Sequence, residues 1–349
     1  MLKENIDHYP AVTIGLVTFD RIGMLKEAVY SVLNQSFGDF LLLIGNDSPE
    51  APVTFDVLGI DPDPRIQIIN HEKNLGQLAN LNHLLNASSS KWFTWMGDDD
   101  LLHPDFLQRL VQCAQDHSER NIAALYTNYI SGPLPPSEFP LIPNEDAFAC
   151  ISPTSTFLND YTAKKYHIIG SFGLMKTDAL KSVHGLPQLG RGFSPYCDTL
   201  MPILLADHGG IAWIDEPLVF LRTHAVSESV NSTDFDAYAS AESDFLDSLH
   251  KVCARQSDPC EQECVRNMVW WFAFDEWCVL ARNTSLSRMG VINAFLSCQF
   301  TVNFQRLKPR YWVSFLFYIH RLVLKRRLHS LHLSLIAFKK KIVGLLSVS

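Results

Sequence analysis

Short apolar runs alternate with segments of helical spacing over the first hundred residues. Residues 12–18 (VTIGLVT) form one such run, with the length and composition of a strand buried on both faces. Between the runs, apolar residues recur three or four positions apart, which is typical of helices with one buried side. This alternation predicts an α/β fold built on a parallel sheet with right-handed crossovers. The expected strands are residues 12–18, 40–45, 66–69 and 92–96, and the expected helices are residues 24–35, 76–85 and 106–117.

The pattern changes after residue 130. Residues 131–143 hold five prolines, which predicts a surface loop or a lid. Residues 190–195 (GRGFSP) indicate a flexible segment, and the pattern is helical from residue 234 to the end. Between these segments the expected helices are residues 177–183 and 195–207, and the expected strands are residues 211–214 and 218–221.

Polar side chains stand where the expected strands end. Thr18 and Asp20 follow the first strand, Asp47 follows the second, and three aspartates follow the fourth. In open α/β sheets, ligands bind beyond the carboxyl ends of the strands. If these strands are neighbours, the side chains converge on one edge of the sheet. The sequence therefore predicts a polar binding site at that edge.

Asp98, Asp99 and Asp100 are adjacent carboxylates at the end of an apolar strand. Like charges repel, so a fold that holds them together usually binds a cation there. Their oxygen ligands suit Mg²⁺ or Mn²⁺, and such an ion typically carries substrate phosphates. The alternative is a solvated acidic turn that caps the next helix.

Composition bounds the class of protein. The chain has 349 residues and 47% hydrophobic content, enough for a full core in one or two domains. Its eight cysteines are scattered with no CxxC pair, which favours reduced thiols over a disulfide framework or a zinc site. The first residues lack a basic segment followed by an apolar one, so a secretory signal is not expected. These features fit a reducing cytoplasm.

Charge divides the chain into an acidic body and a basic tail. Residues 1–276 hold 17 of the 29 basic residues and all 37 acidic ones, a net charge of −20, whereas residues 277–349 hold 12 basic residues and no acidic one. The body is not expected to bind nucleic acid. Residues 309–328 and 331–348 combine helical apolar spacing with lysine and arginine, as interfacial helices on anionic phospholipid do. The alternative is a helical pair packed on the body.

Four segments resemble the inverting family 2 glycosyltransferases, which have the GT-A fold. VTIGLVTFDR resembles the family's opening strand, and FLLLIGNDSPE resembles its second strand and acidic turn. NHEKNLGQLANLNHLLNASSSKWFTWMGDDDLLHP resembles the helix that leads to its DxD-type motif. YCDTLMPILLADHGGIAWIDEPLVFLRTHAVSES resembles its "ED" helix, closing strands and Arg-x-His segment. The match covers roughly residues 10–230, and the four motifs are specific as an ordered set.

The resemblance implies roles for the residues at the sheet edge. Asp47 would hydrogen-bond the base or ribose of a nucleotide, and Asp98 its ribose or phosphates. Asp99 and Asp100 would bind Mn²⁺ or Mg²⁺ on the diphosphate, with His224 as a further metal or diphosphate contact. Thr18, Asp20, Asn74 and Arg222 complete the expected nucleotide-sugar site.

Asp198 matches the aspartate of the "ED" pair, the general base that deprotonates the acceptor hydroxyl. Inversion by a single displacement needs one such base and no covalent intermediate. The alternative for Asp198 is a carboxylate placed at a helix N-terminus by the macrodipole. Two positions depart from the family pattern: Gly97 stands where an aspartate is frequent, and Cys197 replaces the flanking acid of the pair.

Together these patterns predict a metal-dependent transferase. It would move a sugar from a UDP- or dTDP-sugar to a glycan or lipid-linked acceptor of a bacterial surface polysaccharide, on the cytoplasmic face of the membrane. The expected domains are a GT-A domain at 1–230, a helical extension at 231–308 and the basic tail at 309–349. The alternatives are a nucleotidyltransferase or phosphatase using the same aspartates, and a non-catalytic module that binds nucleotide-sugars or glycans.

Overall fold

The computed structural model describes residues 9–135, 150–152, 154–162, 165–191, 196–224 and 235–255. The chain divides into two compact units, Met1–Phe274 and Asp275–Ser349, and all the described residues belong to the first. The predicted basic tail and most of the predicted helical extension therefore lie outside the described residues. Within the described residues, no helix has the length and hydropathy needed to cross a membrane.

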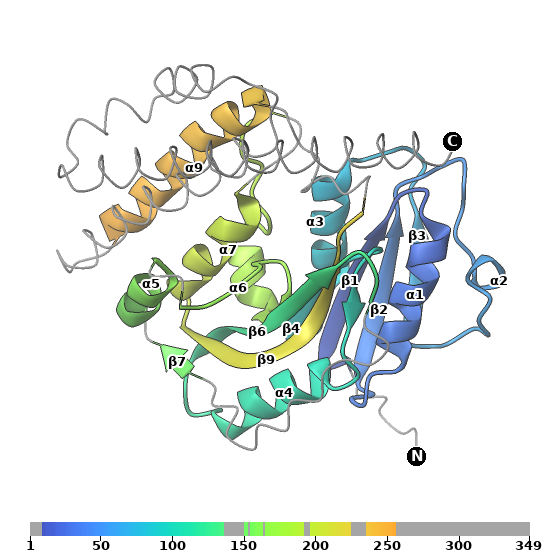
Figure 1. Ribbon diagram of the computed structural model, residues 1–349, viewed down its shortest axis with the longest axis horizontal. Coiled ribbons are helices and arrows are strands. Elements are labelled where there is room, and N and C mark those ends of the chain that lie inside the picture. Colours follow the sequence, from blue (N-terminus) through green and yellow to red (C-terminus); the bar gives the residue numbers. More distant parts are fainter. Residues whose placement is uncertain are drawn as a thin grey trace, which may run out of the picture. The chain divides into compact units, whose positions relative to one another are not determined.

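The first hundred residues form the parallel half of a sheet (Figure 1). Its strands lie in the order β3-β2-β1-β4, and every neighbouring pair is parallel. All seven residues of β1 are buried, which is why this strand is a continuous apolar run in the sequence. The elements of this half are β1 (Val12–Thr18), α1 (Ile22–Leu33), β2 (Phe40–Asn46), α2 (Phe55–Leu58), β3 (Ile66–Asn70), α3 (Gln77–Ala87) and β4 (Trp92–Gly97).

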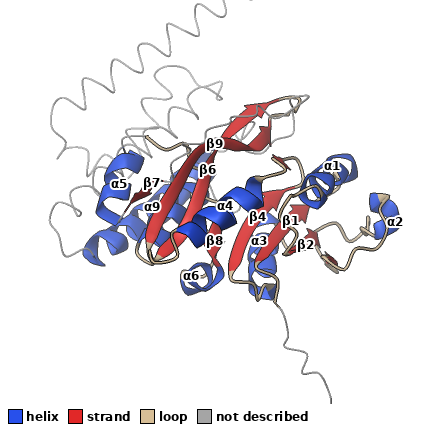
Figure 2. Cartoon of the chain, turned by 90° about the horizontal axis from the view of Figure 1, so that it is seen from below, coloured by secondary structure: helices blue, strands red, loops and turns tan. Residues whose placement is uncertain are grey.

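The second half adds antiparallel pairs, so the whole sheet is mixed. β8 runs antiparallel between β4 and β6, and β6 pairs in parallel with β9. Helices cover both faces of the sheet, as the sequence predicts for this fold class (Figure 2). The elements are β5 (Leu101–Leu102), α4 (Phe106–Asp116), β6 (Ile122–Gly132), β7 (Cys150–Ser152), α5 (Thr154–Thr162), β8 (Gly173–Lys176), α6 (Thr177–Ser182), α7 (Cys197–Ala206), β9 (Gly210–Arg222) and α9 (Phe235–Arg255).

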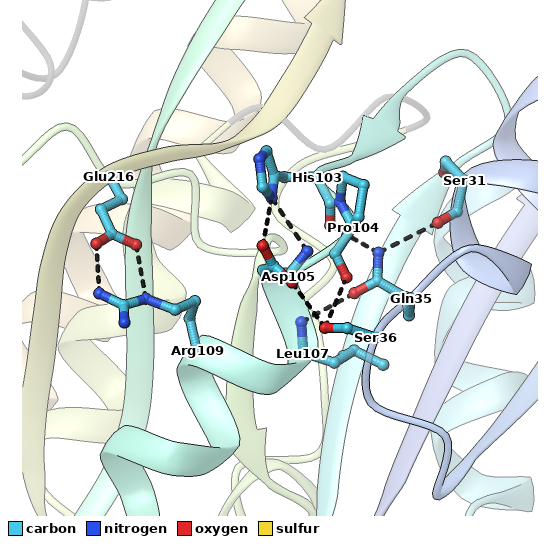
Figure 3. Close-up of polar contacts among 9 residues, drawn as sticks. All are labelled: Ser31, Gln35, Ser36, His103, Pro104, Asp105, Leu107, Arg109 and Glu216. Atoms are coloured by element: carbon cyan, nitrogen blue, oxygen red, sulfur yellow. Dashed lines mark hydrogen bonds and ion pairs between the residues drawn. The ribbon is translucent and has the colours of Figure 1, made fainter. Parts of the chain in front are cut away.

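β9 is one strand of 13 residues, where the sequence predicts two. The predicted gap falls on Asp215, Glu216 and Pro217, which interrupt the apolar pattern. Glu216 is only 5% exposed. Its burial is compatible with its charge because both its carboxylate oxygens pair with the guanidinium of Arg109 on α4 (Figure 3). The pairing of β9 with β6 shifts register at this point, so the strand continues through an irregularity.

The predicted proline-rich loop begins inside a strand. β6 runs to Gly132, and residues 136–149 lie outside the described residues. The predicted helix at 195–207 is α7, and residues 192–195 of the predicted flexible segment are also outside them.

Candidate active site

The carboxyl ends of three parallel strands meet at one edge of the sheet. Thr18, the last residue of β1, lies opposite Asn46 at the end of β2, and Val17 lies opposite Gly97 at the end of β4. The aspartate triplet therefore begins directly beside Thr18. The Thr18 hydroxyl donates a hydrogen bond of 2.6 Å to Asp98 Oδ2. The structure thus brings together the polar strand ends that the sequence singles out.

Asp98 is fully buried, and one of its carboxylate oxygens accepts a side-chain hydrogen bond while the other is in an ion pair only. Oδ2 accepts the hydrogen bond from Thr18, and Oδ1 lies 2.7 Å from Nη2 of Arg21. Burial raises the pKa of Asp98, while the Thr18 hydroxyl and the Arg21 charge oppose that rise. Asp98 is therefore held by two side chains of the β1–α1 segment.

Asp99 is partly exposed, and one of its carboxylate oxygens contacts both an arginine and a histidine side chain. Nη1 of Arg21 lies 3.0 Å from Oδ2, and Nε2 of His224 lies 2.9 Å from the same atom. His224 comes from the segment after β9, 125 residues along the chain. The family resemblance alone pointed to this proximity, since nothing local in the sequence links the two residues.

Arg222 fastens the triplet from the end of β9. Its backbone amide donates to Asp100 Oδ1 over 3.1 Å, and its Nε donates to the Asp99 carbonyl over 3.0 Å. Its guanidinium also pairs with Glu27 on α1. Burial, and then the Asp99 charge, hold the pKa of Asp100 well above the ordinary range. The predicted nucleotide-sugar contact of Arg222 stays a prediction, and two of its guanidinium nitrogens already contact Glu27 and the Asp99 carbonyl.

Two carboxylate oxygens of the triplet face the same space over Gly97. A Cβ atom built at Gly97 would lie 2.7 Å from Asp99 Oδ1 and 3.1 Å from Asp100 Oδ2. Neither of these two oxygens accepts a hydrogen bond from a described residue. The absence of a side chain at Gly97 therefore leaves both oxygens open toward one point.

These two oxygens fit a hard divalent cation. Mg²⁺ is commonly bound through one or two carboxylates, with substrate phosphates and water completing its shell. Among the described residues, no group of three or more histidine, cysteine, aspartate and glutamate side chains is arranged to hold a metal ion. A cation here would therefore take Asp99, Asp100 and a substrate's oxygens as its ligands. His224 Nε2 contacts the Asp99 carboxylate. The predicted role of His224 as a direct metal ligand stays a prediction.

The predicted nucleotide contacts on β1 and β2 have partners within the protein. Asp47 Oδ1 and Oδ2 accept backbone hydrogen bonds of 2.7 and 2.8 Å from Leu75 and Gly76, so Asp47 fixes the turn that opens α3. Asn74 Oδ1 also accepts from Gly76, whose φ of +85° favours glycine. Asp20 accepts a hydrogen bond from Ser48. The roles of these residues toward a nucleotide stay predictions.

Asp198 lies in the first turn of α7. Burial raises its pKa, and hydrogen bonds with the hydroxyl and backbone amide of Ser171 oppose that rise. Ser171 in turn accepts a backbone hydrogen bond of 3.3 Å from Trp95 on β4, two residues before Gly97. Through Ser171, the candidate base is thus attached to the strand that carries the triplet. Burial raises the pKa of the Cys197 thiol, so Cys197 does not supply the negative charge of the carboxylate that it replaces in the "ED" pair.

The sequence analysis missed residues that hold the site together. Gln35, two residues after the end of α1, donates to the carbonyls of Ser31 and His103 over 3.1 and 2.7 Å and accepts from the Leu107 amide over 3.0 Å (Figure 3). It thereby ties α1 to the segment that follows the triplet. Its main partners are 68 and 72 residues away, so no local pattern marks it.

Two further side chains went unnoticed. The Tyr126 hydroxyl on β6 is fully buried and has no hydrogen-bond partner among the described residues. Burial raises its pKa, and the charges of Tyr161 and Asp198 add to that rise. Phe19, directly after β1, is 47% exposed at the sheet edge. The exposure of Phe19 beside the site is visible only in three dimensions.

Comparison with known proteins gives the chain a family. Residues 13–183 match the model of glycosyl transferase family 2. One curated relative is the GalNAc(5)-diNAcBac-PP-undecaprenol beta-1,3-glucosyltransferase of Campylobacter jejuni, which is 28% identical over 109 residues. That alignment covers 31% of this chain and 35% of the relative. The chain therefore spans about a third of the length of this curated relative.

Solved structures share the fold. S. aureus TarS 1-349 in complex with UDP aligns with 90% of this chain and 81% of its own, with a TM-score of 0.51 and 13% identity. The mannosyltransferase PcManGT from Pyrobaculum calidifontis, in complex with GDP-Man and Mn²⁺, aligns with 91% of this chain and 87% of its own, with a TM-score of 0.50 and 14% identity. These likenesses confirm the predicted GT-A type of α/β fold. Through residues 13–183, the chain belongs to glycosyl transferase family 2.

Proposed function

We propose that the protein is a metal-dependent, inverting glycosyltransferase. It moves a sugar from a nucleotide-diphosphate sugar to a hydroxyl of a glycan or lipid-linked acceptor. One observation carries the proposal: two open carboxylate oxygens, Asp99 Oδ1 and Asp100 Oδ2, face one point at the carboxyl edge of the sheet in a family 2 domain. A non-catalytic module would have no need to keep both such a pair and a candidate base.

Asp99 and Asp100 would hold a Mn²⁺ or Mg²⁺ ion. When bound, the ion neutralises the charge that develops on the leaving diphosphate. The solved neighbours support a nucleotide-sugar donor, since their structures contain UDP or GDP-Man with Mn²⁺. A UDP- or dTDP-sugar is the donor we expect. The exposed ring of Phe19 offers a surface on which the nucleobase can stack.

Asp198 acts as the general base of the proposed reaction. Its carboxylate takes the proton of the acceptor hydroxyl while the hydroxyl oxygen attacks the anomeric carbon, and the bond from that carbon to the diphosphate oxygen breaks. The burial that raises its pKa makes Asp198 a better proton acceptor than an ordinary aspartate. The contact with Ser171 keeps the carboxylate oriented while its proton is absent.

The acceptor and the location are inferred from one relative and from the basic tail. The Campylobacter jejuni relative is named for a glycan on undecaprenyl diphosphate, which supports a lipid-linked acceptor. The basic tail at 309–349 supports contact with an anionic membrane, which we place on the cytoplasmic side. Removal of the chain after residue 308 is expected to move the protein from the membrane fraction to the soluble one. An unchanged distribution would contradict the membrane contact.

A donor screen tests the proposed activity. Purified protein is incubated with UDP-, dTDP- and GDP-sugars and Mn²⁺, and the released nucleotide is measured. We expect release from one donor, loss of that release in Asp99→Ala, and full release in the matched control Asp116→Ala, which removes an exposed carboxylate of α4. No release and no metal-dependent binding of any donor would favour the non-catalytic binding module.

A further inference from the structure

Arg21 bridges two carboxylates of the triplet. Its Nη2 lies 2.7 Å from Asp98 Oδ1, and its Nη1 lies 3.0 Å from Asp99 Oδ2. The other arginine at the site, Arg222, gives its guanidinium to Glu27 and to a backbone carbonyl. Arg21 is therefore the permanently charged group that neutralises the triplet carboxylates among the described residues. Neither its position nor its spacing in the sequence predicts this contact.

The surroundings of Arg21 allow its side chain to leave. The side chain is 31% exposed, against 9% for Arg222. Arg21 stands at the N-cap of α1 without a side-chain capping bond, so the helix does not need its guanidinium. Its neighbours Phe19 and Ile22 are exposed at 47% and 41%. The segment between β1 and α1 thus borders solvent at the place where a donor would enter.

Arg21 and a divalent cation would share the Asp99 carboxylate. Arg21 contacts Oδ2, while Oδ1 is one of the two oxygens open over Gly97. A guanidinium on one oxygen and a divalent ion on the other repel each other over a few ångströms, with little water between them. A nucleotide diphosphate removes this conflict, because its negative phosphates can receive the guanidinium.

We propose that Arg21 is a resident counter-cation that couples metal binding to donor binding. Before ligands arrive it neutralises Asp98 and Asp99 and weakens the binding of a free divalent cation. When cation and donor bind together, Arg21 turns from the carboxylates to the diphosphate. This inference rests on the proposed function, because it requires the cation at Asp99 and Asp100. Its consequence is that the protein binds the metal well only in company with the donor.

Calorimetric titration of the full chain with MnCl₂ tests this coupling. Each protein is titrated alone and with saturating UDP or GDP, so the gain in Mn²⁺ affinity from the nucleotide is measured directly. We expect Arg21→Gln to bind Mn²⁺ alone about tenfold more tightly than the wild type does. The increase in Mn²⁺ affinity that the nucleotide causes should then be about tenfold smaller in this variant, because binding couplings are reciprocal. The matched control is Arg65→Gln, which removes an arginine paired with Asp63 and should change neither value.

Two more variants separate the possible outcomes. Arg21→Lys keeps the charge, but a single ammonium cannot span both carboxylates, so its Mn²⁺ affinity should fall between those of the wild type and the glutamine variant; it also secures a reading if the glutamine variant does not fold. Unchanged or weaker Mn²⁺ binding by folded Arg21→Gln, or a lysine variant that behaves like the glutamine one, would overturn the inference. If Asp99→Ala leaves Mn²⁺ binding intact, the proposed metal site itself is wrong. If Asp99→Ala abolishes binding while Arg21→Gln does nothing, only the role of Arg21 fails.

Discussion

The two sides of the candidate site are held in different ways. At the donor edge, Asp47 and Asp98 have partners on both carboxylate oxygens, from backbone amides in one case and from Thr18 and Arg21 in the other. On the side of Asp198, the carboxylate is held through Ser171, and the nearby Tyr126 hydroxyl has no partner among the described residues. The carboxylates at the donor edge are therefore fixed by contacts from several segments, whereas Asp198 is fixed through one residue.

Replacing the base should have the largest effect, and it should lower the transfer rate without changing the binding of donor and metal. Asp198→Asn keeps the shape but cannot take a proton, so the transfer rate is expected to fall about 10³-fold. The affinity for donor and Mn²⁺ should stay at the wild-type value, because Asp198 lies outside the metal-facing pair. Kinetics with a defined acceptor and calorimetry with Mn²⁺ and UDP measure the two quantities. A loss below tenfold would assign the base elsewhere.

Loosening the donor edge should cost stability. Gln35→Ala removes two buried hydrogen bonds and a partly buried one, and leaves the carbonyl of His103 and the amide of Leu107 without that partner. The free energy of unfolding is expected to fall by about 2–3 kcal/mol. Urea unfolding followed by tryptophan fluorescence measures the change. Gln112→Ala on the exposed side of α4 is the matched control, and an equal loss in both variants would refute the special place of Gln35.

Filling the space over Gly97 should block the metal without damaging the fold. In Gly97→Ala the new methyl group meets Asp99 Oδ1 at 2.7 Å and must push the carboxylates aside. The affinity for Mn²⁺ in the presence of UDP or GDP is expected to fall about tenfold, which corresponds to about 1.4 kcal/mol. Titration of the variant gives the affinity, and its melting temperature shows whether the fold is kept. Full Mn²⁺ affinity in this variant would place the cation elsewhere.

The raised pKa of Asp198 should produce the smallest effect, in the stability of the protein. A carboxyl whose pKa is higher in the folded state than in the unfolded one favours folding at low pH, and this contribution is lost as the pH rises through the folded pKa. Asp198→Asn removes the titration. The melting temperature of the variant relative to the wild type should therefore be higher at pH 7 than at pH 4. A difference that does not change with pH would contradict the raised pKa.

The parallel half of the fold was predictable because its signals are local. β1 has the predicted bounds of 12–18, since a strand buried on both faces must be apolar throughout. β9 was predicted as two strands, because the group that makes Glu216 compatible with burial is Arg109, 107 residues earlier. β6 escaped prediction altogether, and its partners β8 and β9 come later in the chain. What a single sequence cannot show is the pairing of distant residues.

The candidate site follows the same division. The strand-end rule located Thr18 and the aspartates, because each stands directly after an apolar run. The family resemblance located His224, whose contact with Asp99 spans 125 residues. The contacts of Arg21 and the two backbone partners of Asp47 needed the structure, since a side chain's partner depends on where the chain returns. The functions of these residues stay predictions until the variants are measured.

The continuity of β9 has a consequence for hydrogen exchange. This strand pairs with β6 along its whole length, with β7 along its first part and with β5 near its end, and its last amide donates to Asp100. Amides bonded along one continuous strand open together rather than one by one. Deuterium uptake along Gly210–Arg222 should therefore be slow and nearly uniform, and a donor that contacts only the edge near Asp100 should slow uptake as far back as Trp213.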